Sequence, residues 1–233
     1  MAFVNYAHRG ASEYAPENTM SSFELGLQMG ANGIETDVQL TRDNMLVLFH
    51  DRTLARVTGE AGCVSDYTYE ELLKFRVKKD DKTDQIVLLQ DFLERFSGKG
   101  LKMAIELKQK GTAMPVAIMV GLYDADDEVI ITSFDYEELL EMRAFAPNLE
   151  CGFLAREVDD TLLDRMKEDG FCELCPPADI VTPEKVRQWK AQGFRVRAWG
   201  VKNTELMQRA YDAGVDGMTV NFPDKLAEYI QKA

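Results

Sequence analysis

The sequence is poor in basic residues, in long apolar runs and in leader-like features, and each shortage argues against a class of protein. It has 27 lysines and arginines against 40 aspartates and glutamates, and the net charge of −13 disfavours nucleic acid or an anionic membrane as a partner. No window approaches the roughly 18 apolar residues of a membrane-spanning helix. The short apolar start before His8 and Arg9 also does not resemble a secretion leader. We therefore expect a cytoplasmic protein that has neither a membrane nor a nucleic acid as its partner.

The sequence also has few cysteines and lacks a glycine-rich phosphate-binding loop. The four cysteines, Cys63, Cys151, Cys172 and Cys175, suit a reducing cytosol in which they remain thiols. Cys172 and Cys175 form a lone C-x-x-C without a second ligand pair nearby, so packing is favoured over zinc binding or redox use. The sequence contains no G-x-G-x-x-G or Walker pattern that would favour a nucleotide-binding sheet.

What the sequence does contain is a regular alternation of strand-like and helix-like segments. The expected strands are Phe3–Ala7, Gly33–Leu40, Leu101–Leu107, Val129–Ser133, Leu149–Leu154, Asp179–Val181, Phe194–Trp199 and Asp216–Val220. The expected helices include Thr19–Met29, Tyr136–Phe145, Pro183–Ala191 and Thr204–Ala213. Thr182 and Asn203 are predicted N-caps. Eight strands alternating with helices predict a parallel (β/α)8 TIM barrel, a single domain over residues 1–233.

Four helices are expected to end in a glycine that is followed almost at once by a strand. These glycines are Gly30, Gly170, Gly193 and Gly214, and each is a plausible left-handed helix stop. Their recurrence favours repeated βα units, with a doubly wound sheet as the alternative.

One stretch interrupts the alternation after the second strand. Leu46–Phe49 is an extra apolar run that ends at His50, and residues 51–90 are then largely polar. This stretch contains an expected helix at Tyr69–Phe75 and a charged patch at Lys78–Asp84. We expect an inserted excursion above the barrel rim, without a core of its own, and not a separate domain.

The two histidines of the chain, His8 and His50, each follow an apolar run directly. Active sites of parallel barrels are built at the carboxyl ends of the strands. A lone histidine is more often structural, but both histidines of a histidine-poor chain at such positions indicate a catalytic role.

Acidic side chains occur at alternating positions of two expected strands. Glu35 and Asp37 lie two residues apart, so both point to one face of their strand, and Glu106 and Lys108 repeat this arrangement. Carboxylates crowded into a partly dry site repel one another unless a cation joins them. Three oxygen donors without cysteine or histidine ligands favour one divalent hard cation, Mg²⁺ or Ca²⁺.

The charges of these residues fit a phosphodiester. With a divalent cation added to the three carboxylates, Arg9 and Lys108, the pocket has one net positive charge when both histidines are neutral. Arg9 and Lys108 could hold the non-bridging oxygens, and His8 and His50 could act as base and acid. The pattern predicts a metal-dependent phosphodiesterase.

At these residues the chain resembles the glycerophosphodiester phosphodiesterase family. The similar segments are residues 8–12 (HRGAS), 16–19 (PENT), 33–38 (GIETDV), 48–51 (LFHD), 53–59 (TLARVTG), 105–108 (IELK), 198–203 (AWGVKN) and 214–217 (GVDG). They span nearly the whole chain.

The resemblance implies a TIM barrel that hydrolyses a small glycerophosphodiester to sn-glycerol 3-phosphate and an alcohol such as choline or ethanolamine. It implies Glu35, Asp37 and Glu106 as metal ligands, and His8 and His50 as the acid–base pair. It also places Arg9 and Lys108 on the phosphate and Trp199 on the glycerol side. The leaving alcohol, the metal used in the cell and the oligomeric state stay open. The attacking group also stays open, between water and the glycerol 2-hydroxyl, and we favour the hydroxyl.

Two positions depart from the family pattern. Asn221 stands where a Thr-Asp pair is common, and Val87 stands where a proline is usual. Neither is expected to contact the proposed ligands or catalytic residues, although Asn221 could affect hydrogen bonding in the pocket floor. Two alternatives are a lipid-cleaving barrel phospholipase, disfavoured by the acidic composition, and a non-catalytic phosphoester-binding barrel, disfavoured by the retention of both histidines.

Overall fold

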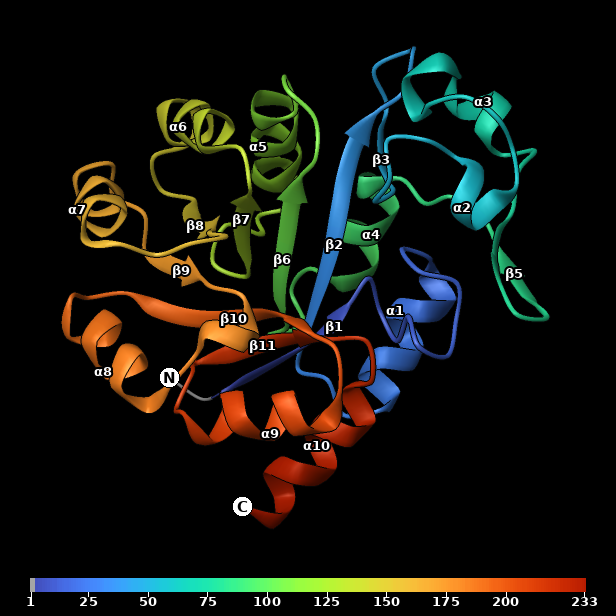
Figure 1. Cartoon of the computed structure of the whole chain (residues 1–233). Coiled ribbons are helices and arrows are strands. Elements are labelled where there is room, and N and C mark those ends of the chain that lie inside the picture. Colours follow the sequence, from blue (N-terminus) through green and yellow to red (C-terminus); the bar gives the residue numbers. More distant parts are fainter. Residues whose placement is uncertain (1–2) are drawn as a thin grey trace.

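The main sheet closes into a barrel of eight parallel strands in the computed structural model, which describes residues 3–233 (Figure 1). The barrel strands are β1 (Val4–His8), β2 (Gly33–Leu40), β6 (Lys102–Leu107), β7 (Val129–Ser133), β8 (Glu150–Leu154), β9 (Glu173–Cys175), β10 (Arg195–Val201) and β11 (Gly217–Val220). Strand β1 pairs in parallel with both β2 and β11, and these pairings close the barrel. The predicted TIM barrel is confirmed.

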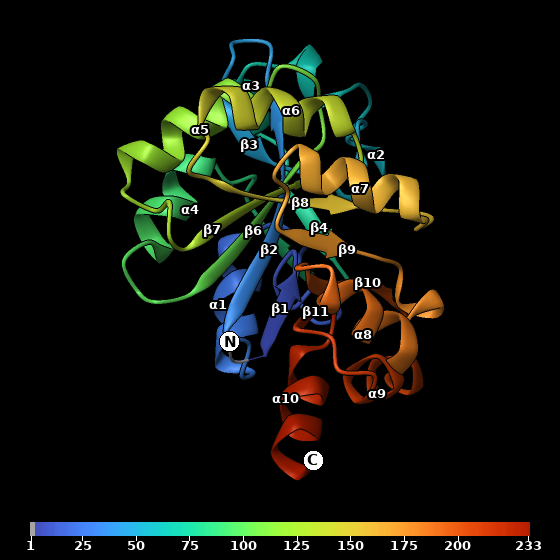
Figure 2. The ribbon, with the colours of Figure 1, turned by 90° about the vertical axis from the view of Figure 1, so that its left-hand side faces the viewer.

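Helices surround the barrel on the outside, as the two perpendicular views show (Figures 1 and 2). They are α1 (Met20–Gln28), α4 (Leu89–Phe96), α5 (Ala113–Leu122), α6 (Tyr136–Phe145), α7 (Asp160–Glu168), α8 (Pro183–Ala191), α9 (Thr204–Asp212) and α10 (Pro223–Lys232). One continuous apolar core lies between helices and strands, and Ile34, Val38, Ile105 and Leu107 contribute to it. These side chains point outward, toward the helices. Because side chains alternate along a strand, the adjacent residues of β2 and β6 point into the barrel. Within residues 3–233, none of the helices has the length and apolar character needed to cross a bilayer.

The predicted helix boundaries agree with the structure where a cap residue marks them. Thr182 and Asn203 accept hydrogen bonds from Lys185 N and Leu206 N in the first turns of α8 and α9. The four predicted glycine stops all have positive φ, with values of 89° at Gly30, 73° at Gly170, 97° at Gly193 and 87° at Gly214.

The predicted sixth strand is wrong. Asp179–Val181 lies at a short 3₁₀ helix, η2 (Ala178–Ile180), and the sixth barrel strand is β9, a few residues earlier. Glu173, the first residue of β9, obscured this strand because a charged residue is unusual in a buried strand. Inside the barrel, however, Arg197 Nε donates to Glu173 Oε1 at 2.7 Å, so the carboxylate is paired.

The excursion lies to one side of the barrel mouth, at the upper right of Figure 1. It contains β3 (Leu46–Leu48), which pairs antiparallel with β2, then α2 (Ala55–Thr58), η1 (Val64–Asp66), α3 (Tyr69–Leu72), β4 (Val77–Lys79) and β5 (Lys82–Asp84). The expectation that it lacks a core is wrong, because a separate cluster is formed by Val47, Phe49, Leu54, Val57, Val64, Leu72, Val77 and Ile86. These residues are spread singly through a polar sequence, which hid the cluster. The predicted end at residue 90 also lies inside α4, a helix of the main core.

Candidate active site

Three carboxylates meet at the carboxyl ends of β2 and β6. Asp37 and Glu106 are register partners, and Glu35 precedes Asp37 by two residues on the same face. One oxygen of each carboxylate lies within 4.8 Å of the others, and the three residues are 3%, 0% and 7% exposed for Glu35, Asp37 and Glu106. In the described chain, this is the one group of three or more metal-ligating side chains with such spacing. The structure therefore brings together the three predicted ligands.

Arg9 and Lys108 surround this cluster with positive charge. Arg9 Nε lies 3.1 Å from Asp37 Oδ2, and Lys108 Nζ lies 2.7 Å from Glu106 Oε1 and 3.6 Å from Asp37 Oδ1. Burial alone would raise the pKa of Asp37, but the two cations outweigh it and hold this pKa well below its usual range. Burial, together with Asp37, raises the pKa of Glu106 to about 7. Burial and the two other carboxylates raise the pKa of Glu35 well above its usual value.

The carboxylate cluster fits a hard divalent cation. Asp37 Oδ1 is buried and receives no hydrogen bond from the described residues, so it retains a free ligating oxygen. All three donors are carboxylate oxygens, the ligand type that Mg²⁺ and Ca²⁺ prefer. Burial, and then repulsion between the carboxylates, raises the pKa values of Glu35 and Glu106 despite the two local cations, so a further positive charge would be stabilised there.

His8 ends β1 beside this cluster. Its Nδ1 lies 2.5 Å from Asn221 Oδ1, and its Nε2 lies 3.8 Å from Glu35 Oε2. Because an amide oxygen only accepts, this contact places the proton on Nδ1 and leaves Nε2 free for the pocket. The expectation that Asn221 does not touch the catalytic residues is wrong, since the residue holds the His8 ring.

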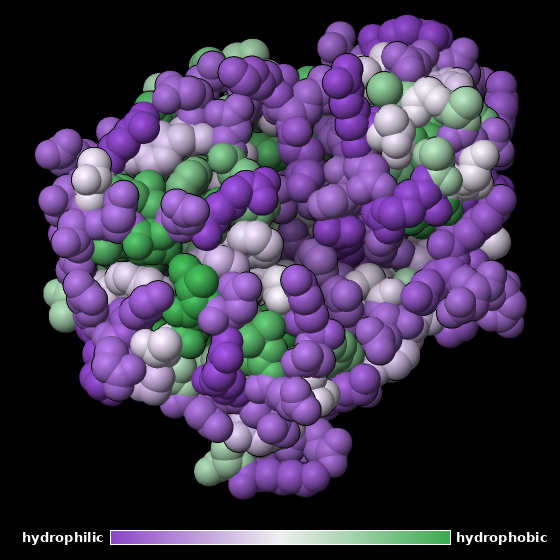
Figure 3. All heavy atoms as spheres, viewed as in Figure 1, coloured by the Kyte–Doolittle hydropathy of each residue, from purple (hydrophilic) through white to green (hydrophobic). Residues whose placement is uncertain are grey.

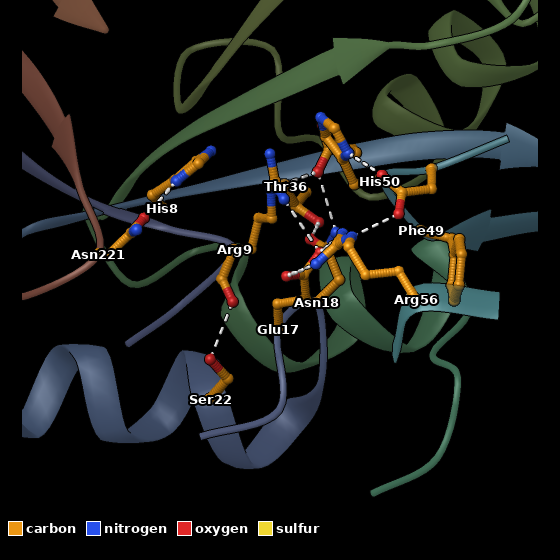
Figure 4. Close-up of polar contacts among 12 residues, drawn as sticks. His8, Arg9, Glu17, Asn18, Ser22, Thr36, Phe49, His50, Arg56 and Asn221 are labelled. Atoms are coloured by element: carbon orange, nitrogen blue, oxygen red, sulfur yellow. Dashed lines mark hydrogen bonds and ion pairs between the residues drawn. The ribbon is translucent and has the colours of Figure 1, made fainter. Parts of the chain in front are cut away.

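His50 stands after β3, on the excursion side of the site. Its Nδ1 lies 2.7 Å from Asp51 Oδ1, and Arg56 Nε donates to the other oxygen of Asp51 at 2.5 Å. Arg56 and Arg9 both donate to Glu17, at 2.7 Å and 3.0 Å. A continuous chain of ion pairs thus connects the His50 ring to Arg9, and the two histidine rings lie on either side of Arg9 in Figure 4.

Two site residues adopt left-handed backbone conformations that are uncommon outside glycine. Arg9 has φ of 54° and Asn18 has φ of 55°. Asn18 Nδ2 donates to Asp37 Oδ2 at 2.9 Å, and Asn18 Oδ1 accepts from Thr36 Oγ1 at 2.8 Å. Such conformations persist where surrounding contacts impose them, and they are concentrated at functional sites. Asn18 thereby fixes the orientation of a proposed metal ligand.

The site opens into a pocket with a volume of about 310 Å³. His8, Arg9, Glu35, His50 and Glu106 line its polar side. Its apolar side is formed by Phe134, Leu154, Trp199 and Val201, from the ends of β7, β8 and β10. In Figure 3 hydrophilic surface occupies the centre of this face, and apolar surface is visible to its left.

Trp199 is fixed on this apolar side by its neighbours. Its Nε1 donates to Cys175 O at 3.0 Å, and the ring of Phe134 meets it edge-on at a centroid distance of 5.0 Å. Cys175 is buried, in keeping with the predicted packing role, and its Sγ lies near Arg197.

Sequence reasoning assigned no role to several residues that position the site. Glu17, Asn18, Asp51 and Arg56 lie within the motifs that carry the family resemblance, so their proximity in sequence to His8 and His50 was an available signal. Arg197 had no such signal. It is buried inside the barrel, donates to Glu173 and Thr219, and lines the pocket together with Glu35.

Comparisons with known proteins agree on one family. The Glycerophosphoryl diester phosphodiesterase family matches residues 8–225. A glycerophosphodiester phosphodiesterase of Caldanaerobacter subterraneus is 33% identical, over 97% of this chain and 97% of the relative. Another, of Bacillus altitudinis, is 33% identical over 94% of this chain and 95% of the relative.

Solved structures share the fold. A phosphodiesterase of Oleispira antarctica, solved in complex with the product sn-glycerol-3-phosphate, has a TM-score of 0.86 at 25% identity and covers 98% of this chain and 96% of its own. The structure of a Thermotoga maritima glycerophosphodiester phosphodiesterase has a TM-score of 0.81 at 23% identity, covering 100% of this chain and 99% of its own.

Proposed function

Since the chain belongs to the glycerophosphoryl diester phosphodiesterase family, we propose that it hydrolyses glycerophosphodiesters to sn-glycerol 3-phosphate and an alcohol, with one divalent cation, Mg²⁺ or Ca²⁺. One observation carries this proposal. Both histidines line one pocket together with Arg9, Glu35 and Glu106. Asp37 and Lys108 lie directly behind this lining, where Asp37 pairs with Arg9 and Lys108 pairs with Glu106. Binding alone would not need two histidines with free ring nitrogens.

Glu35, Asp37 and Glu106 are proposed to hold the cation. When bound, the cation supplies positive charge beside the phosphorus and polarises the phosphoryl group. Arg9 and Lys108 stand next to the ligands and bind the non-bridging phosphate oxygens. Arg9 is kept in place by Glu17 and Lys108 by Glu106, so neither cation has to be ordered when substrate arrives.

The neighbours of the two rings assign a direction to the proton transfer. Asn221 holds Nδ1–H of His8, so a neutral Nε2 is ready to accept a proton. Burial lowers the pKa of His50, with Arg9 and Lys108 acting in the same direction, and Asp51 on the Nδ1 side offsets this only in part. A protonated His50 ring therefore gives up its Nε2–H readily. His8 is the proposed base and His50 the proposed acid.

These roles complete the reaction in two steps. The glycerol 2-hydroxyl gives its proton to His8 and its oxygen bonds to phosphorus. The bond from phosphorus to the alcohol oxygen breaks, and His50 protonates the departing alcohol. In the second step water opens the cyclic phosphate: His50 takes a proton from the water, and His8 returns its proton to the glycerol O2.

The excursion belongs to this catalytic unit in our proposal. Asp51 and Arg56 come from it and support His50, so the barrel alone would lack part of its site. A cytosolic location is also proposed, supported by four cysteines that are all unpaired.

The test is a coupled assay for release of glycerol 3-phosphate, run across several headgroups with and without a chelator. We expect release that chelation abolishes and that Mg²⁺ or Ca²⁺ restores. Glu35→Gln and Asp37→Asn should each weaken the affinity for the cation, so that more Mg²⁺ or Ca²⁺ is needed to restore activity, because each removes one full charge from the ligand set. Undiminished turnover after exhaustive chelation would overturn the metal assignment, and no release from any headgroup would overturn the activity.

A further inference from the structure

A second cavity adjoins the catalytic pocket on the excursion side. Its volume is about 410 Å³, and it is lined by Gln39, His50, Arg52, Ser65, Lys108 and Gln109. His50 lines both cavities, whereas His8 lines only the first. The two cavities therefore meet at the ring that is the proposed acid.

The position of this cavity follows from the alternation along β2. Glu35, Asp37 and Gln39 succeed one another on one face of the strand, and each pair of residues advances about 7 Å. Gln39 thus lies one step beyond the carboxylates, toward the barrel rim. Lys108 continues the same direction on β6, beyond Glu106. The carboxylates thus lie between the Trp199 pocket and this cavity, and a phosphodiester held at them would have one cavity on each side.

The orientation of the substrate follows from His50. An acid that protonates the leaving oxygen has to stand beside that oxygen, and His50 stands where the two cavities join. The departing alcohol therefore belongs in the second cavity, and the glycerol that carries the attacking hydroxyl belongs beside His8.

The lining of the second cavity defines the alcohol that it accepts. Gln39 is buried, and its Nε2 donates to the carbonyls of Phe49 and Asp51 at 2.8 Å each, so its Oε1 is left to accept from a ligand. Gln109 Oε1 accepts from Leu40 N at 3.1 Å, which leaves its Nε2 to donate. Both amides are therefore oriented by the protein before a ligand enters.

The charged and hydroxyl groups of the lining also favour an uncharged alcohol that forms hydrogen bonds. The Arg52 side chain forms no ion pair with any residue between 3 and 233. The backbone carbonyl of Arg52 accepts from Val64 N at 3.2 Å, and this contact places the Arg52 backbone beside Ser65. No lining residue is acidic, and Asp51, next to His50 in the chain, is engaged by His50 and Arg56. Figure 3 shows hydrophilic surface continuing from the centre of this face toward the excursion.

We infer that this cavity is the subsite for the leaving alcohol and that it selects a hydroxyl-rich, uncharged alcohol, such as glycerol or inositol, over a cationic one. The inference rests on the proposed function. A polyol presents donors and acceptors that match Gln39, Ser65, Gln109 and Arg52. Choline and ethanolamine carry a positive charge that calls for aromatic faces or carboxylates, and the cavity offers neither, while Arg52 and Lys108 repel a cation.

The test compares kcat/KM for glycerol 3-phosphate release from glycerophosphoinositol and glycerophosphoglycerol with that from glycerophosphocholine and glycerophosphoethanolamine. We expect the polyol substrates to be favoured by about 10-fold or more, the effect of one or two matched hydrogen bonds to a charged or polar group. Arg52→Glu should reduce this ratio by at least about 10-fold, because it replaces a cation in the cavity wall by an anion. Arg76→Glu is the matched control, since Arg76 is an exposed arginine of the same excursion that does not line the cavity.

Each outcome separates this inference from the proposed function. If all four substrates are cleaved with equal kcat/KM, or if the cationic ones are favoured, the subsite assignment is wrong and the activity stands. The same holds if Arg52→Glu lowers kcat/KM equally for every substrate, because Arg52 would then contact the shared glycerol phosphate. Equal ratio changes in Arg52→Glu and Arg76→Glu would show a long-range field and would likewise overturn the subsite. If no substrate releases glycerol 3-phosphate, the proposed function fails and the inference fails with it.

Discussion

Protonation of Glu106 should control both metal binding and stability. Burial beside Asp37 raises the pKa of Glu106 from its ordinary 4.5 to about 7. In the metal-free protein the folded state therefore favours the protonated carboxyl. The stability that this group contributes is fully present below about pH 4.5 and is lost as the pH rises through about 7.

The size of this effect follows from the pKa difference. A shift of that extent corresponds to about 3 kcal/mol of unfolding free energy, at about 1.4 kcal/mol per pKa unit. In a chain of this length, 3 kcal/mol moves the melting temperature by roughly 10 °C. A bound divalent cation keeps Glu106 ionised, so at pH 6 binding has to displace its proton. The apparent affinity for Mg²⁺ or Ca²⁺ at pH 6 should then be about tenfold weaker than at pH 8, with proton release.

The assay is thermal melting from pH 5 to pH 8, in chelator and at fixed Mg²⁺ or Ca²⁺ concentrations, supported by titration calorimetry in two buffers of different ionisation enthalpy. The wild type is compared with Glu106→Gln, which removes the titrating group, and with Glu70→Gln, an exposed carboxylate of the excursion. We expect the cation to raise the melting temperature more at pH 8 than at pH 6 in the wild type and in Glu70→Gln. The difference should be smaller in Glu106→Gln, in which only Glu35 still has a raised pKa among the ligands. Equal increments at both pH values in the wild type, or no increment, would show that Glu106 does not exchange a proton for the cation.

Three further predictions concern catalysis and backbone geometry. His8→Ala and His50→Ala should each lower kcat by about 100-fold or more with little change in KM, because proton transfer is lost while the phosphate contacts remain, and steady-state kinetics showing less than a tenfold loss would contradict the assigned roles. A substrate without the glycerol 2-hydroxyl should not be hydrolysed measurably, and cleavage at nearly the parent rate would identify water as the attacking group. Gly10→Ala should destabilise the protein by about 3 kcal/mol or more, because the added Cβ would lie 2.3 Å from Ser22 Oγ and 2.4 Å from its carbonyl carbon at a φ of +81°. Gly98→Ala is its control, with a φ of +73° and nothing within 4 Å of the added Cβ, and similar melting temperatures for the two variants would count against the steric argument.

The barrel and the centre of the site were predictable from the amino-acid pattern, because both depend on local geometry. The alternation of β2 and β6 alone places Glu35, Asp37 and Glu106 on the inner face and Ile34 and Val38 on the outer one. Glycine stops and N-caps are likewise set within one helix turn, so they too were predicted correctly. The placement of both histidines needed only the rule that barrel sites form at strand ends.

Contacts between distant segments were not predictable from any local pattern, because they depend on how the strands pair. Strand β9 was missed because Glu173 is acceptable inside the barrel only when Arg197, 24 residues later, neutralises it. Asn221 holds His8 across 213 residues of sequence, a pairing that exists because β11 closes the barrel against β1. The excursion's own core and the second cavity also arise where separately placed side chains meet. In each case the free energy of a side chain depends on a partner whose position is fixed by strand pairing, and no local pattern records that position.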